Sequence, residues 1–150
     1  MDVHVFPDAG AATNAAADLV ARLLTAARAV MLPGGNSPLR LYGELVTRRI
    51  DLAETEFFVL DEYLGVPDSD PRTCSNLIWR TFGEPAQVDR ERFHRLPSDP
   101  RPAPAAIAAH ERAIAAVGGL DLVILGLGVN GHLGFNEPGS APDSPGRVVE

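Results

Sequence analysis

The chain alternates short apolar runs with longer segments of helical periodicity, and this alternation restricts the folds that it can adopt. In the longer segments apolar residues recur about every 3.6 positions, as in a helix with one buried face. The expected helices are residues 8–28, 38–46, 74–82 and 104–117. The expected strands are residues 2–6, 29–33, 56–60 and 120–125, with a short extended piece near 92–96. Strands that alternate with helices form a parallel sheet covered on both faces, so we predict an α/β, doubly wound, mostly parallel, Rossmann-like fold.

We expect all 150 residues to form one domain. A chain of this length with 45% hydrophobic residues can bury a substantial core, and it contains no internal repeat or low-complexity tract. Residues 146–150 ("GRVVE") read as the beginning of a further element. We therefore expect the sheet to be incomplete at the C-terminus, and residues 1–150 to be the N-terminal part of a longer domain.

Charge and cysteine content exclude several classes of protein. The net charge is −7, with 13 Lys and Arg against 20 Asp and Glu, whereas binding to nucleic-acid phosphates needs clustered basic residues. No apolar stretch approaches the roughly twenty residues of a membrane span, and no signal peptide is evident. The single cysteine, Cys74, excludes an internal disulfide, and we interpret it as a small filler residue. We expect a cytoplasmic protein without nucleic-acid or membrane partners.

The loop after the second expected strand, "PGGNSP", has the composition of a phosphate site. Ligands of doubly wound sheets bind beyond the carboxyl ends of the strands. Gly34 and Gly35 allow close approach of an anion, Asn36 and Ser37 offer polar side chains, and the next helix directs its free N–H groups to the same place. The alternative is an ordinary turn in which Ser37 is the N-cap and Pro38 the first helical residue. No Lys follows the glycines, so this is not a P-loop.

The third expected strand runs directly into two acids, Asp61 and Glu62. A carboxylate at the edge of a sheet is partly desolvated and can serve as a general base. Successive side chains of an extended chain alternate sides, so we expect only one of the two to face a shared pocket. The alternative is a purely structural acid that caps a neighbouring element.

The stretch "LGLGVNGHLGFNEPG" follows the last expected strand and carries glycines at 126, 128 and 131, the spacing of a dinucleotide-binding loop. That loop requires a helix beginning within the glycines and an acid about twenty residues later. Neither is present, so we expect no dinucleotide and no other cofactor. The segment instead holds polar residues among glycines, and His132 and Glu137 are placed to form an acid/base pair.

A metal site is the remaining alternative for these acids and the imidazole. Asp61, His132 and Glu137 could ligate a divalent ion, but no second His lies three or four positions from His132. The other histidines fall on unrelated segments, and we expect His110 on a helix surface. We therefore expect no metal.

The three loops, in this order, resemble the glucosamine-6-phosphate deaminase and 6-phosphogluconolactonase superfamily. The resemblance covers nearly the whole chain and rests on "LPGGNSPLRLYGELV", "FFVLDEYLGVPDSDPRTCSN" and "LGLGVNGHLGFNEPG". The "DEY" and "FNEP" residues favour the deaminase branch, whereas the loop at 34–37 is nearer to the lactonase style. Asn130 stands where some members of the family have Asp, and Asn cannot ionise.

The resemblance implies roles for particular residues. Asp61 would be the base that moves the C2 proton of the open-chain amino sugar to C1. His132 would open the pyranose ring, with Glu137 oriented against it and Asn130 in the same hydrogen-bonded series. The expected substrate-binding residues are Gly34, Gly35, Asn36, Ser37, Glu62 and Gly131.

The implied function is an enzyme, a hydrolase or isomerase that converts glucosamine 6-phosphate into fructose 6-phosphate and ammonia without a cofactor. Its expected partners are a small sugar phosphate and, as a further possibility, other copies of itself. Two alternatives stay open: a lactonase that uses His132 to activate water, and a non-catalytic sugar-phosphate sensor.

Overall fold

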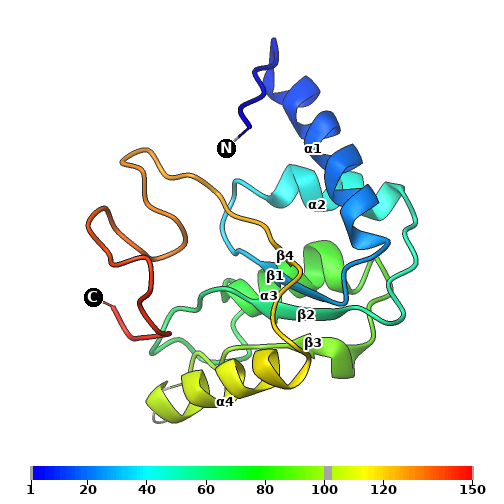
Figure 1. Ribbon diagram of the computed structural model, residues 1–150. Helices are drawn as coiled ribbons and strands as arrows, with labels where there is room; N and C mark the ends of the chain where they lie inside the picture. Colours follow the sequence, from blue (N-terminus) through cyan, green and yellow to red (C-terminus); the bar gives the residue numbers. More distant parts are fainter. Residues whose placement is uncertain (1, 100–102, 150) are drawn as a thin grey trace.

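The computed structural model describes residues 2–99 and 103–149 and contains a four-stranded sheet (Figure 1). Its order is β3-β2-β1-β4, and all three pairings are parallel. The strands are β1 (Ala29–Leu32), β2 (Glu56–Val59), β3 (Phe93–His94) and β4 (Leu122–Val123). The predicted fold class, a parallel sheet in an α/β arrangement, is confirmed.

Helices cover both faces of the sheet. They are α1 (Ala9–Leu24), α2 (Leu39–Thr47), α3 (Cys74–Ile78) and α4 (Ala103–Ala116). Helix α3 continues into a π-helical turn, η1 (Trp79–Gly83), and a short 3-10 helix, η2 (Arg90–Arg92), leads into β3. Figure 1 shows α4 on the opposite side of the sheet from α1 and α2. All four expected helices are therefore present, with boundaries shifted by a few residues.

The main core lies between the sheet and α1, α2 and η1. Residues that alternate along β1 and β2 point to this face, and helical residues pack against them. The ring of Phe82 lies 5.4 Å from that of Phe57 and 5.5 Å from that of Tyr42. The hydroxyl of Tyr42 is buried and donates to the carbonyl of Pro33 at 2.7 Å. This bond fixes α2 against the residue that follows β1, where the first candidate loop begins.

On the other face, α4 contacts β2 through His110. The His110 ring meets Phe58 edge-on at 5.5 Å, and its Nε2 lies 3.0 Å from the carbonyl oxygen of Val59. Burial lowers the pKa of His110. The expectation that His110 lies on a helix surface is wrong, because the apolar face of this alanine-rich helix is not continuous and the imidazole supplies the contact with the sheet.

Strand β4 lies at one edge of the sheet and is only partly covered. The carboxylate of Asp121 accepts from the N–H groups of Arg28 at 2.8 Å and Ala29 at 3.1 Å, which joins the start of β4 to the start of β1. From β4 onward, every second residue is an exposed apolar side chain. The exposed fractions are Val123 41%, Leu125 46%, Leu127 75% and Val129 108%.

Besides that of His110, two other local predictions are wrong. Residues 2–6 form no strand, and Val3 and Val5 are 71% and 90% exposed. Their alternating pattern fits a strand, but this segment pairs with neither edge strand of the described sheet and leads directly into α1 (Figure 1). Ser37 is not the N-cap of α2. Pro38 takes that position in a helical conformation and has no side-chain acceptor, so α2 has no side-chain cap.

Candidate active site

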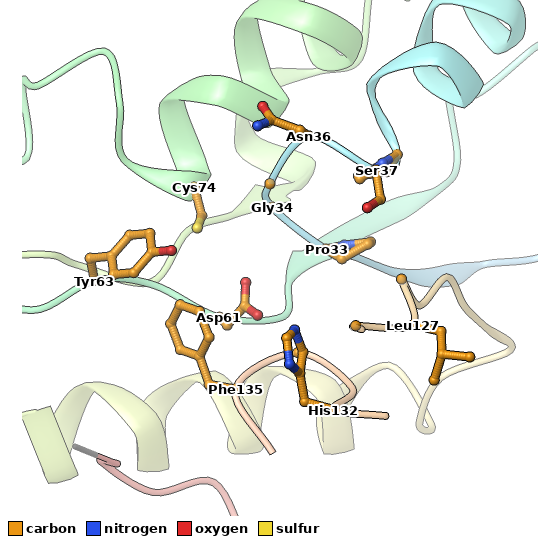
Figure 2. Close-up of a pocket in the computed structure, with 15 residues that line it drawn as sticks. Pro33, Gly34, Asn36, Ser37, Asp61, Tyr63, Cys74, Leu127, His132 and Phe135 are labelled. Atoms are coloured by element: carbon orange, nitrogen blue, oxygen red, sulfur yellow. The ribbon is translucent and has the colours of Figure 1, made fainter. Parts of the chain in front are cut away.

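The three loops singled out in the sequence meet beyond the carboxyl ends of β1, β2 and β4. They surround an open cavity of about 250 Å³ (Figure 2). Its walls come from residues 33–38, 61–63 and 126–135, and from the first residue of α3. The lining residues are Pro33, Gly34, Gly35, Asn36, Ser37, Pro38, Asp61, Tyr63, Cys74, Gly126, Leu127, Gly128, His132, Gly134 and Phe135.

The loop at 33–38 forms the wall next to α2. Gly35 has φ +83°, a conformation that favours glycine, and a Cβ at this position would meet no atom within 4 Å. Because α2 has no side-chain cap, the backbone N–H groups of its first turn lack side-chain acceptors. The hydroxyl of Ser37 points toward the cavity in Figure 2. A hydroxyl, two glycines and the N-terminus of a nine-residue helix can bind a phosphate group.

Asp61 lies one residue beyond Leu60, whose N–H extends the β1–β2 ladder with a 2.9 Å bond to Leu32. Burial raises the pKa of the Asp61 carboxyl, and hydrogen bonds from the Gly34 N–H and the Cys74 thiol act in the opposite direction. The carboxylate faces the cavity (Figure 2). A carboxylate in this environment can accept a proton from a bound molecule.

Glu62 points elsewhere, as the alternation of side chains predicted. Its carboxylate accepts from the N–H groups of Cys74 and Ser75, both at 2.9 Å, and so caps α3. Glu62 does not line the cavity, and Gly131 does not either. Their expected contacts with substrate stay predictions.

The third loop holds His132 in a hydrogen-bonded series. His132 Nδ1 lies 2.7 Å from Asn130 Oδ1, and Asn130 Nδ2 donates to Glu137 Oε2 at 2.6 Å. His132 Nδ1 is 3.8 Å from the nearer Glu137 oxygen, so Asn130 bridges the pair that the sequence predicted as a direct contact. Because Asn130 presents its oxygen to the ring, Nδ1 is the donor in this bond, and in a neutral imidazole Nε2 is then the acceptor.

Glycines in this loop make room for the imidazole. A Cβ on Gly128 would overlap the His132 ring, and the Gly128 N–H donates to the His132 carbonyl at 2.9 Å. Gly131 has φ +91° and closes the turn with a 3.0 Å bond to the Gly128 carbonyl. No helix begins between residues 126 and 139, so the helix N-terminus that a dinucleotide loop requires is missing from this segment.

The arrangement does not bring together a metal-binding set. Among the described residues, no group of three or more His, Cys, Asp and Glu side chains could hold a metal ion. In the same part of the chain, no helix has both the length and the apolar character needed to cross a membrane.

A model of the family described as glucosamine-6-phosphate isomerases/6-phosphogluconolactonase matches residues 7–135, which include Asp61, His132 and the loop at 33–38. The chain belongs to this family. Two curated relatives named glucosamine-6-phosphate deaminase show the similarity over most of the chain. The protein from Pseudarthrobacter chlorophenolicus is 42% identical over 120 residues, covering 78% of this chain and 46% of its own length. The protein from Mycolicibacterium smegmatis is 40% identical over 159 residues, covering 99% of this chain and 59% of its own length.

Solved structures of the family have the same fold. A monomeric glucosamine-6-phosphate deaminase, described as a missing link of the NagB superfamily, superposes with a TM-score of 0.88 at 25% identity, over 96% of this chain and 62% of its own. A 6-phosphogluconolactonase from Thermotoga maritima superposes with a TM-score of 0.69 at 24% identity, over 83% of this chain and 57% of its own. This chain spans about half to three-fifths of these relatives. The comparisons support an enzyme family acting on sugar phosphates. The expectation of a hydrolase fits the curated relatives poorly, since both are named as deaminases.

Within this family site, two features were not predicted from the sequence. The rings of Tyr63 and Phe135 lie 5.0 Å apart and line the cavity from different loops. Cys74, interpreted as a filler residue, is 3% exposed but forms part of the cavity wall beside Asp61. The aromatic residues belong to the "DEY" and "FNEP" motifs, and this membership is the sequence feature that could have indicated their place in the site. No local pattern connects Cys74 with the site.

Proposed function

We propose that this chain carries the acid/base centre of a glucosamine-6-phosphate deaminase, which converts glucosamine 6-phosphate and water into fructose 6-phosphate and ammonia. The observation that carries the proposal is the placement of the Asp61 carboxylate and the His132 ring in one cavity beside the loop at 33–38. The names of the curated relatives support the same reaction.

The phosphate group would bind at the loop of Gly34, Gly35, Asn36 and Ser37. The first-turn N–H groups of α2 and the Ser37 hydroxyl can donate to phosphate oxygens, and the helix dipole favours a dianion there. Bound in this way, the phosphate would direct the sugar carbons toward Asp61 and His132, which fixes the geometry of the proton transfers.

His132 would open the ring. Its unprotonated Nε2 accepts the proton of the C1 hydroxyl and returns it to the ring oxygen, so that the C1–O5 bond breaks and C1 becomes an aldehyde. Asn130 accepts from Nδ1 and donates to Glu137, a series that stabilises the imidazolium formed between the two transfers.

Asp61 would carry out the isomerisation. The carboxylate removes the proton from C2 and delivers it to C1, while one proton of the substrate ammonium group ends on O1. C1 then becomes a hydroxymethyl group and C2 an iminium carbon. Water adds to C2 and ammonium leaves, which gives the ketose phosphate. The raised pKa of Asp61 matches the task, since a base with a pKa closer to the working pH transfers protons more efficiently.

The test is turnover by the full-length protein with the substitution Asp61→Asn. We expect the release of ammonia and fructose 6-phosphate to fall by about 10² to 10⁴, the usual contribution of a general base. The matched control is Asp143→Asn, which changes an exposed carboxylate outside the cavity. Full activity of Asp61→Asn would overturn the role of Asp61.

The same preparation separates the alternatives. Hydrolysis of a 6-phospho-lactone without ammonia release from the amino sugar would indicate a lactonase. Thermal stabilisation by sugar phosphates without turnover of either compound would indicate a sensor. Either result would contradict the deaminase proposal.

A further inference from the structure

Glu62, the residue after Asp61, is joined to α3 by hydrogen bonds. Glu62 accepts from the N–H groups of Cys74 and Ser75 at 2.9 Å each, so the chain just after β2 is held against the first turn of α3. Thr73 caps the same helix by accepting from the Asn76 N–H at 3.2 Å. These bonds fix the position of the Cys74 backbone relative to that of Asp61.

The side chain of Cys74 is enclosed between Gly34 and the cavity. A Cβ built on Gly34 would lie 2.5 Å from the Cys74 sulfur and 2.7 Å from its Cβ, so the two residues are in close contact. The sulfur points from α3 toward the space occupied by Asp61 (Figure 2). With Gly34 beside it and its backbone held by Glu62, the thiol has little freedom to turn away.

The thiol is a hydrogen-bond donor and not a nucleophile. Burial raises the pKa of Cys74 to about 12, and the negative charges of Asp61 and Glu62 add to this effect. The sulfur therefore keeps its proton at neutral pH, and the Asp61 carboxylate lines the same cavity wall (Figure 2). A thiolate is the reactive form of cysteine, so this residue is chemically inert in the folded protein.

We propose that Cys74 is a positioning residue for Asp61: its protonated thiol donates to the Asp61 carboxylate, together with the Gly34 N–H, and holds that carboxylate toward the cavity. The inference rests on the proposed function, in which Asp61 is the base. It gives a role to the close contact between Gly34 and Cys74, which would bring both donors to the same carboxylate.

The two donors also set the basicity of the carboxylate. A hydrogen bond to the charged form stabilises that form and lowers the pKa, in opposition to burial. Removal of the thiol leaves Asp61 with one donor fewer in the same buried place. Its pKa then rises further above the ordinary value.

The test measures the Asp61 pKa directly, by NMR titration of the full-length protein labelled with ¹³C at the aspartate carboxyl carbons. Asp61→Asn identifies the resonance. We expect Cys74→Ala to raise the Asp61 pKa by about one unit, within the range that a single hydrogen bond to a carboxylate produces. We expect Cys74→Ser, which keeps a donor, to leave the pKa unchanged or lower it.

Kinetics give the matching readout. In Cys74→Ala the acid limb of the kcat/KM profile should move to higher pH by the same amount, whereas in Cys74→Ser it should not. If Cys74 only filled space, the alanine variant would not show a higher pH for the acid limb than the serine variant. An unchanged Asp61 pKa in folded Cys74→Ala overturns the proposal.

A second measurement uses the unaltered protein, so that it does not depend on a variant that folds. Iodoacetamide at pH 8 should leave Cys74 unmodified in the native state and modify it in urea. Modification of the native protein at the rate of a free thiol would show a thiolate in place of a donor and would also overturn the proposal. The NMR titration needs no turnover, so failure of the positioning role is distinguishable from failure of the deaminase reaction, which only the Asp61→Asn assay decides.

Discussion

Gly34 is the position at which the smallest substitution should have the clearest structural effect. Its φ lies outside the left-handed region, so the backbone conformation allows alanine. A side chain at this position is instead disfavoured by steric overlap with Cys74. The new Cβ would lie 2.5 Å from the Cys74 sulfur and 2.7 Å from its Cβ, about 1 Å closer than normal contact distances. The Cys74 Cβ is fixed to the backbone of α3, and Glu62 holds that backbone, so relief requires movement of the helix.

The size of the effect follows from two opposing contributions. Overpacking typically costs about 1–3 kcal/mol. Replacement of glycine by alanine reduces the conformational entropy of the unfolded chain and so stabilises the folded state by about 0.4–1 kcal/mol. We therefore expect Gly34→Ala to lower the free energy of unfolding by about 1–2 kcal/mol net. With an m-value of about 2 kcal/mol per molar, the urea midpoint should fall by roughly 0.5–1 M.

Two companion variants give the prediction its controls. Gly43→Ala lies in α2, where a Cβ would meet no atom within 4 Å, and should stabilise by about 0.5–1 kcal/mol. Cys74→Gly removes both clashing atoms and leaves the Cys74 Cα at 3.4 Å, so in this background Gly34→Ala should lose most of its effect. Equal unfolding midpoints for Gly34→Ala and Gly43→Ala would refute the reasoning.

Two further predictions concern the supports of the cavity. Tyr42→Phe leaves the Pro33 carbonyl without its 2.7 Å buried donor and should lower the free energy of unfolding by about 1–3 kcal/mol, measured by urea unfolding; an unchanged midpoint would contradict the role of this bond. Burial lowers the pKa of His110 below its ordinary 6.5, so the neutral ring contributes stability that is present above pH 6.5 and is lost as the pH falls through the lowered value. Thermal unfolding from pH 7.5 to 4.5 should show this loss in the unaltered protein and less of it in His110→Gln, and parallel curves would contradict it.

Most of the fold could be predicted from the sequence because its elements have strong local patterns. Strand β1 is a continuous apolar run and β2 is apolar after Glu56, and Asp8, with the periodic residues after it, specifies α1. The segment at 2–6 has an alternating pattern that is also typical of strands but forms none, since a strand needs a neighbour and local sequence does not specify one. The burial of His110 was missed for a related reason: which face of α4 meets the sheet depends on the packing of the whole domain.

The candidate site was predicted in outline and not in its contacts. Because strand ends converge at one edge of a parallel sheet, the three loops could be expected to meet. The residues alone could not predict the bridge through Asn130, which only the family resemblance implied, because spacing along the chain does not determine which of two nearby acceptors an imidazole reaches. The same holds for Cys74, which contacts Gly34 from forty positions away and lies in a stretch with no catalytic pattern.

The exposed apolar side chains that begin at β4 affect how the chain behaves toward other chains. A row of apolar residues beside the free edge of a strand is a template onto which another extended segment can pair. In this molecule the row from Val123 to Val129 is therefore a part of the described surface that favours self-association. The brevity of β4, at two residues, and the net charge of −7, which makes copies of the chain repel one another, both oppose that tendency. The balance between them should depend on ionic strength, because salt screens the repulsion and leaves the apolar row unchanged.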